Sequence, residues 1–123
     1  MKIHYLFLLL LLSGCSSTQR ATKTYGEALF QHWTHSYEED AGGQKVYRPA
    51  GYDFPPSRGR EGFEIRPDGV YIRYAIGRAD YPEQMKGSWK MKGTDSIVVD
   101  LPSTPVFELK IISVEKDRLI VRQ

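Results

Sequence analysis

Short segments in which apolar and polar residues alternate, separated by turn residues, constrain the fold of this 123-residue chain more than any other feature. The clearest is Met85–Lys92, where Met85, Gly87, Trp89 and Met91 alternate with lysine and serine. Successive side chains of a β-strand point to opposite faces, so this period of two predicts a strand with the apolar set inward. No segment has the pattern of a helix longer than about two turns, so we expect an all-β chain.

The same alternation predicts strands in most of the remaining chain, with Gly and Pro residues between them. On the fourth of these strands, Val70 and Ile72 face one way and Tyr71 and Arg73 the other, as in a half-buried strand. The predicted strands are Gln31–Glu38, Lys45–Arg48, Gly62–Arg66, Val70–Ile76, Met85–Lys92, Ser96–Leu101, Val106–Val114 and Arg118–Gln123.

Two local sequence patterns refine this prediction of strands. Pro67-Asp68-Gly69 has the chemistry of a hairpin turn, because Gly supplies the positive φ that such turns need. Ile111 and Ile112 are adjacent apolar residues that break the alternation of their strand, which predicts a β-bulge. About eight strands without crossover helices predict a single antiparallel meander, and closure into a small barrel would leave no exposed edges.

The first 15 residues have a different character. Lys2 precedes the apolar run Tyr5–Leu12, which has the length of a signal-peptide core and is too short for a permanent membrane helix. The run ends in Leu-Ser-Gly-Cys, with the cysteine at Cys15, and this placement resembles the lipobox of bacterial lipoproteins. The alternative is that Cys15 is an ordinary thiol in a signal peptide cleaved elsewhere.

The lipobox resemblance implies a domain order and a location. Residues 1–14 would be a lipoprotein signal peptide, and Cys15 would carry a diacylglyceryl group and a further acyl chain such as palmitate, which anchors it to a membrane. We expect residues 15–27 to be the lipidated cysteine with a flexible tether, because Ser16–Thr24 is polar, and residues 28–123 to be the barrel domain. Ser16 and Ser17 stand where an inner-membrane lipoprotein commonly has Asp, which favours the outer membrane of the bacterial cell envelope, facing the periplasm.

Charge and cysteine usage exclude several classes of function. Without residues 1–14 the chain keeps 16 basic and 15 acidic side chains, scattered without long runs, which argues against a nucleic-acid partner. Cys15 is the only cysteine, so the barrel domain has neither an internal disulfide nor a thiolate metal site. The sequence contains no motif that implies a cofactor or catalysis, and we expect no enzyme activity.

The strand order is similar to that of the lipocalin-like barrels of bacterial envelopes. Trp33 lies on the first predicted strand, as in lipocalins, and Gly87-Ser88-Trp89 repeats the Gly-x-Trp pattern in mid-chain. The resemblance implies that Arg118 or Arg122 covers Trp33, provided that the first and last strands pair. It implies a fold more than an activity.

Three groups of residues are candidates for a site, each with a structural alternative. Arg58 and Arg60, in a loop made rigid by Pro55-Pro56, could bind an anion at the barrel mouth, or could pair with nearby carboxylates such as Glu38. Aromatic residues form the second group: some could line an apolar ligand cavity, with Trp33, Tyr74 and Trp89 as the candidates, or together they could fill a narrow barrel completely. The full aromatic set is Trp33, Tyr37, Tyr47, Phe63, Tyr71, Tyr74, Trp89 and Phe107.

The third group has a spacing that suits a metal only on a helix. His32, His35 and Glu38 are three residues apart, which would put them on one helix face. On the strand predicted here, His32 and His35 point to opposite faces, so we expect no metal site.

These observations lead to two hypotheses of function. The first is an envelope lipoprotein whose lipocalin-like barrel binds a small hydrophobic or anionic ligand at its mouth. The alternative is a solid-core barrel that docks another envelope protein through the loop Asp53–Glu61. An interior void of a few hundred Å³ that opens to solvent would favour the first hypothesis.

Overall fold

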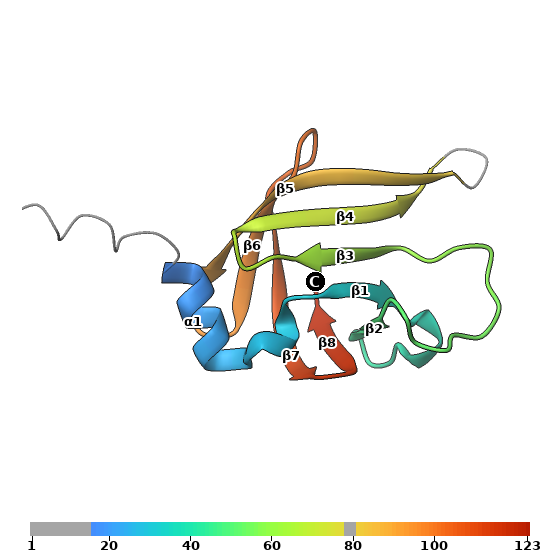
Figure 1. The fold of residues 1–123 in the computed structure, drawn as a ribbon, viewed down its shortest axis with the longest axis horizontal. Helices are drawn as coiled ribbons and strands as arrows, with labels where there is room; N and C mark the ends of the chain where they lie inside the picture. Colours follow the sequence, from blue (N-terminus) through green and yellow to red (C-terminus); the bar gives the residue numbers. More distant parts are fainter. Residues whose placement is uncertain (1–15, 78–80) are drawn as a thin grey trace, which may run out of the picture.

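A computed structural model of the chain describes residues 16–77 and 81–123. It shows the predicted all-β fold: eight antiparallel strands close into a barrel, with one short helix before them (Figure 1). The strands are β1 (His32–His35), β2 (Lys45–Pro49), β3 (Gly62–Ile65), β4 (Val70–Ile76), β5 (Pro82–Lys92), β6 (Ser96–Asp100), β7 (Phe107–Glu115) and β8 (Arg118–Arg122). The helical elements are α1 (Ser16–Tyr25) and the single 3₁₀ turns η1 (Glu27–Leu29) and η2 (Tyr37–Glu39).

Strands β3 to β8 pair in sequence order, as in a meander, and β2 closes the barrel against β8. The departure from simple order is at the start, because β1 lies between β2 and β3 and pairs with both. The last strand therefore pairs with β2 and not with β1, so the condition for Arg118 or Arg122 to cover Trp33 is not met.

The position of β1 explains the long loop between β2 and β3. Both of these strands run antiparallel to β1, so the chain must travel the whole length of β1 between the end of β2 and the start of β3. Residues 50–61, the crossover segment, make this connection. Its first amide, Ala50, donates to the carbonyl oxygen of His32 (3.2 Å), and its last carbonyl, Glu61, accepts from the amide of His35 (2.8 Å).

One end of the barrel is closed. The turns at residues 66–69, 93–95 and 116–117 lie at this closed end, together with α1 and η1. Leu29 of η1 is fully buried against the core, and Gln31 donates to the carbonyl of Lys116. The opposite, open end carries the β1–β2 loop and the β6–β7 loop. Strand β4 runs toward this end, away from α1, and β5 runs back from it (Figure 1).

Helix α1 is a correction to the prediction of a flexible tether over Ser16–Thr24. These polar residues have no amphipathic apolar face that the sequence alone could reveal, but they find partners on the barrel. Ala21 is fully buried, Arg20 donates to the carbonyl of Gly93 (2.6 Å), and the hydroxyl of Tyr25 donates to the carbonyl of Thr94 (2.9 Å). The predicted signal peptide and Cys15 lie outside the described residues.

The structure confirms two details that the sequence predicted for the strands and differs from the prediction in a third. The register of β7 and β8 shifts between Ile111 and Ser113, so the predicted bulge is confirmed, with Ile111 buried and Ile112 exposed. The inward phase of β5 is confirmed at Trp89 and Met91. The first strand is shorter than Gln31–Glu38, because the chain turns into η2 immediately after Ser36.

Candidate functional site

The open end of the barrel leads into a pocket of about 480 Å³, which we call the mouth pocket. This volume lies within the range of roughly 300–1,000 Å³ that is usual for small-molecule sites. Its wall is built by inward-facing residues of several strands and by the loop before β7. These are Lys45, Tyr47, Glu61, Gly62, Phe63, Tyr71, Arg73, Thr104, Pro105, Val106, Phe107, Leu109 and Gln123.

Aromatic rings from four strands form one side of the mouth pocket. Tyr47 of β2 packs on Phe63 of β3 with ring centroids 4.7 Å apart, and Phe63 stacks on Tyr71 of β4 at 5.4 Å with an interplanar angle of 17°. Tyr71 then meets Phe107 of β7 edge-on at 6.3 Å. The row exists because these four residues face inward from β2, β3, β4 and β7, so that their rings meet in the barrel interior. It offers a ligand an apolar wall of inclined aromatic rings.

The two tyrosines also bring hydroxyl groups into this apolar wall. Burial raises the pKa of Tyr47 to about 12, with Asp40 and Glu61 adding to the effect, and burial also raises the pKa of Tyr71. Both groups are therefore neutral phenols at physiological pH, available as hydrogen-bond donors or acceptors.

The rim of the mouth pocket is charged. Arg73 lies on β4 two residues after Tyr71, and Lys45 opens β2 two residues before Tyr47, so both occupy inward-facing positions. The positive charge of Arg73 partly offsets the rise in the pKa of both tyrosines. No ion pair of Arg73 or Lys45 occurs within the part of the chain that the structure describes. Glu61 is the acidic residue in the wall.

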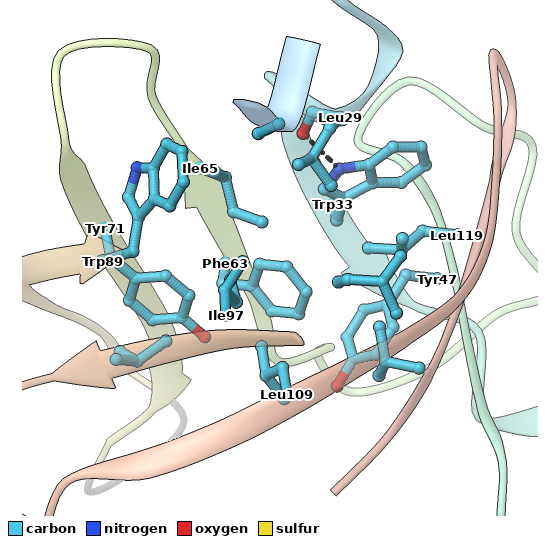
Figure 2. Close-up of a cluster of buried hydrophobic side chains, with 14 of the residues drawn as sticks. Leu29, Trp33, Tyr47, Phe63, Ile65, Tyr71, Trp89, Ile97, Leu109 and Leu119 are labelled. Carbon is cyan, nitrogen blue, oxygen red and sulfur yellow. Dashed lines mark hydrogen bonds between the residues drawn. The ribbon is translucent and has the colours of Figure 1, made fainter. Parts of the chain in front are cut away.

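The rest of the barrel interior is filled, so the mouth pocket does not continue to the closed end. Figure 2 shows residues of this filled part, such as Leu29, Trp33 and Ile65, together with residues of the pocket wall such as Phe63 and Tyr71. Leu29, Trp33, Ile65, Ile97, Leu119 and Val121 are fully buried there. The barrel is therefore solid toward α1 and hollow toward its mouth.

The predicted site residues Trp33 and Trp89 belong to this filled part and do not line the pocket. The indole N–H of Trp33 donates to the carbonyl of Leu29 (3.0 Å), as the dashed line in Figure 2 marks. The indole N–H of Trp89 donates to the carbonyl of Arg66 (2.8 Å). Each tryptophan thus satisfies its polar atom at the closed end, where its role is structural.

Tyr74, a third predicted site residue, lies on the outer face of the barrel. Its ring stacks on His32 with centroids 4.0 Å apart, and its hydroxyl donates to a carboxylate oxygen of Glu64 (3.0 Å). The strand phase explains this position, because Tyr71 and Arg73 face the pocket and alternate residues of β4 face outward.

The predicted anion-binding arginines differ in their surroundings, and neither lines the mouth pocket. Arg60 donates two hydrogen bonds to Glu38, one of them 2.7 Å, and its guanidinium lies over the rings of Tyr37 and Phe54 at 4.7 and 4.5 Å. This pairing lowers the pKa of Glu38 to about 2. Arg60 therefore fastens the crossover segment to η2, which confirms the alternative that it pairs with a nearby carboxylate. Arg58 is exposed to solvent.

The two histidines of β1 have separate partners. His32 stacks on Tyr74 outside the barrel, and His35 bonds to a carboxylate oxygen of Asp40 (2.8 Å) while stacking on Tyr47 (4.9 Å). Glu38, the third member of the spaced set, is bound by Arg60. Among the described residues, no group of three or more His, Cys, Asp or Glu side chains could hold a metal ion.

The sequence reasoning placed Tyr47, Phe63 and Tyr71 only among the aromatic residues that could line a cavity, and it did not place Lys45 or Arg73 at the mouth. A signal for Tyr71 and Arg73 existed in the pairing of β4 with β5. Tyr71 lies opposite Gly87, and Gly87 shares its face with the inward Trp89. Phasing β4 against β5 would have placed Tyr71 and Arg73 inside the barrel.

Comparisons with protein-family models, curated proteins and solved structures give no match for this chain. Within the described residues, no helix has the length and apolar character needed to cross a membrane. The assignment of a function therefore depends on the mouth pocket and on the sequence.

Proposed function

We propose that this protein is a lipid-anchored envelope protein of lipocalin-like type that binds a small ligand in the mouth pocket. The observation that carries the proposal is the union of an aromatic wall with two cationic residues, Arg73 and Lys45, in one pocket of about 480 Å³. An amphipathic anion fits this chemistry, with its apolar body on the wall and its acidic group at the rim. The activity is binding and not catalysis.

The aromatic wall and the charged rim would contribute differently to the free energy of ligand binding. Apolar area removed from water contributes about 25 cal/mol per Å², so contact with Phe63 and Phe107 would supply most of the affinity. A charge-assisted hydrogen bond from Arg73 contributes roughly 1.5–3 kcal/mol, and the neutral hydroxyls of Tyr47 and Tyr71 can add hydrogen bonds. Selection between anionic and neutral ligands would therefore depend on Arg73.

A pair of fluorescent probes tests this division. The chain beginning at Ser16 contains every described residue and has no acyl group that would bind a dye. We expect saturable binding of the anionic probe 1-anilinonaphthalene-8-sulfonate. Arg73→Gln should weaken this binding by roughly 10–100-fold, which corresponds to the loss of one charge-assisted hydrogen bond. Binding of the neutral probe N-phenyl-1-naphthylamine should stay within about twofold, because that probe gains nothing from the charge.

The matched control is Arg58→Gln, which removes the same charge from an exposed position outside the pocket. We expect no change in the binding of either probe. If the Arg58 and Arg73 variants lost the same affinity for the anionic probe, the effect would come from net charge and not from the pocket. Absence of saturable binding would refute the pocket as a ligand site.

The proposed anchor has its own test. Cys15→Ser should release the protein from membranes, because several acyl chains on that residue would supply the attachment. Unchanged membrane association of this variant would refute lipidation. The proposed location is the outer membrane, facing the periplasm, because Ser16 and Ser17 follow the cysteine.

The alternative function, docking of another envelope protein through Asp53–Glu61, has weaker support. Arg60 is occupied by Glu38, Tyr37 and Phe54 and has little surface left for a partner, with 7% of its side chain exposed. The docking hypothesis also assumed a solid core, whereas the barrel has the mouth pocket at its open end.

A further inference from the structure

Helix α1 lies across the closed end of the barrel and is bonded there near both of its ends. At its start, the hydroxyl of Ser17 accepts from the amide of Met91 (3.1 Å), and Thr18 donates to the carbonyl of Pro67. At its last residue, Tyr25 donates to the carbonyl of Thr94. The first residues of the helix are therefore fixed in position relative to the barrel.

Because α1 is bonded to the barrel, it cannot act as a flexible tether between the lipid and the barrel. Cys15, the proposed lipidation site, directly precedes Ser16, and consecutive Cα atoms are about 3.8 Å apart. A flexible chain over Ser16–Thr24 would instead have a root-mean-square length of roughly 15–18 Å. A lipid on Cys15 thus begins within one residue of the folded body, at its closed end.

The exposed surface of α1 suits a lipid headgroup layer. Arg20 and Lys23 are exposed and the helix has no acidic residue, and each such cation near an anionic lipid surface contributes about 1 kcal/mol. The other exposed residues of α1 are Ser16, Gln19, Thr22 and Thr24, all polar. Such a face rests on headgroups and does not insert among acyl chains.

We propose that the lipid anchor and α1 hold the closed end of the barrel against the membrane surface, so that the mouth pocket faces away from the membrane. The proposal rests on the proposed lipidation of Cys15. It predicts that a ligand reaches Arg73 from the aqueous compartment and not from the lipid layer. The long strand β5, whose 11 residues span about 35 Å, runs from the open end to the closed end and so separates the two ends.

Single-site labelling of the full-length lipoprotein can measure this orientation. Cys15 is the only cysteine and would be blocked by its lipid, so an introduced cysteine takes a thiol-reactive fluorophore selectively. Thr94→Cys places the label on an exposed turn of the closed end, and Val106→Cys places it on the exposed β6–β7 loop at the mouth. Each variant is reconstituted into vesicles of phosphatidylethanolamine and phosphatidylglycerol.

Lipids that carry a spin label on the headgroup should quench the fluorophore of the Thr94 variant several-fold more than that of the Val106 variant. A water-soluble quencher should reverse the order. Equal quenching of the two sites, or stronger lipid quenching at Val106, would overturn the proposal.

A flexible Gly/Ser insertion of about ten residues between Cys15 and Ser16 is the control for the direct coupling. We expect the inserted chain to float with vesicles as before but to lose the difference between the two labels. A difference of unchanged size would show that the anchor does not set the orientation. Failure of the unmodified protein to float would refute lipidation itself, and with it the orientation.

Discussion

Gly87 offers the sharpest test of how closely the strands of this barrel pack. A Cβ atom at this position would lie 2.1 Å from the carbonyl oxygen of Asp100 and 2.9 Å from Cδ2 of Leu101. The backbone of Gly87 has an ordinary extended φ, so the conflict in Gly87→Ala is steric and not conformational. Because Asp100 contributes a backbone atom of the neighbouring strand β6, the new methyl group fits only if β5 and β6 move apart.

The size of the effect follows from this geometry. Overpacking a well-packed interior typically costs 1–3 kcal/mol, and the higher figure applies where a rigid backbone must shift. We expect Gly87→Ala to lower the free energy of unfolding by about 3 kcal/mol. For a domain of this size each kcal/mol shifts the melting temperature by about 4–8 °C, so the expected decrease is roughly 12–24 °C.

Urea and thermal unfolding can be followed by tryptophan fluorescence, because Trp33 and Trp89 are both buried. The matched control is Gly51→Ala, since Gly51 has no atom within 4 Å of an added Cβ and no left-handed φ. That change should be neutral or stabilise by up to about 1 kcal/mol. If the unfolding free energy of Gly87→Ala lies within about 0.5 kcal/mol of the wild-type value, the close approach of β5 and β6 is wrong.

Three further predictions concern charge and accessibility. Hydrogen bonds from Arg48 lower the pKa of Glu39 from 4.5 to about 2, so the pair stabilises the fold above pH 4.5 and loses this effect as the pH falls to 2. The difference in urea midpoint between wild type and Arg48→Gln should shrink over that range, and a constant difference would contradict the pairing. Burial raises the pKa of Tyr47 from 10 to about 12, so ionisation in the unfolded chain destabilises the fold between these pH values. Tyr47→Phe should reduce the alkaline loss of melting temperature, and an unchanged loss would count against burial of the hydroxyl. Brief trypsin treatment of the native protein should cut after the exposed Arg58 and spare Arg60, which is bound to Glu38. The substitution Glu38→Gln should speed cleavage after Arg60. An unaltered cleavage rate would show that this ion pair does not hold the crossover segment in place.

Period-two alternation was sufficient to predict the strands, because it follows directly from the pleat of a strand. It predicted the inward phase of β5 and the bulge beside Ile112 for the same reason. The alternation of β4 separates two faces without saying which is inward. Its outer residue Ile72 is buried almost as well as its inner residue Tyr71, at 7% and 3% exposure, so hydrophobicity alone could not choose between them.

The remaining differences come from contacts between distant parts of the chain. Helix α1 has a polar sequence, and its stability depends on bonds to turns such as Gly93 that lie far away in the sequence. The sequence left two alternatives for Arg60, an anion site or a pair with a carboxylate such as Glu38, and the structure confirms the pair through the order of β1, β2 and β3. The sequence did not single out Arg73 among the arginines, because its place in the pocket depends on the face that β4 turns inward.

Closure of the barrel has a consequence for how the chain acquires its structure. Strands β2 and β8 bring Val46 beside Ile120, far apart in the sequence, so this contact forms only after the residues as far as Ile120 have been synthesised. Loops of this length close slowly, and the barrel should fold late and as a whole. A chain cut before Arg118 would leave β2 and β7 with unpaired edges, which invite association between chains.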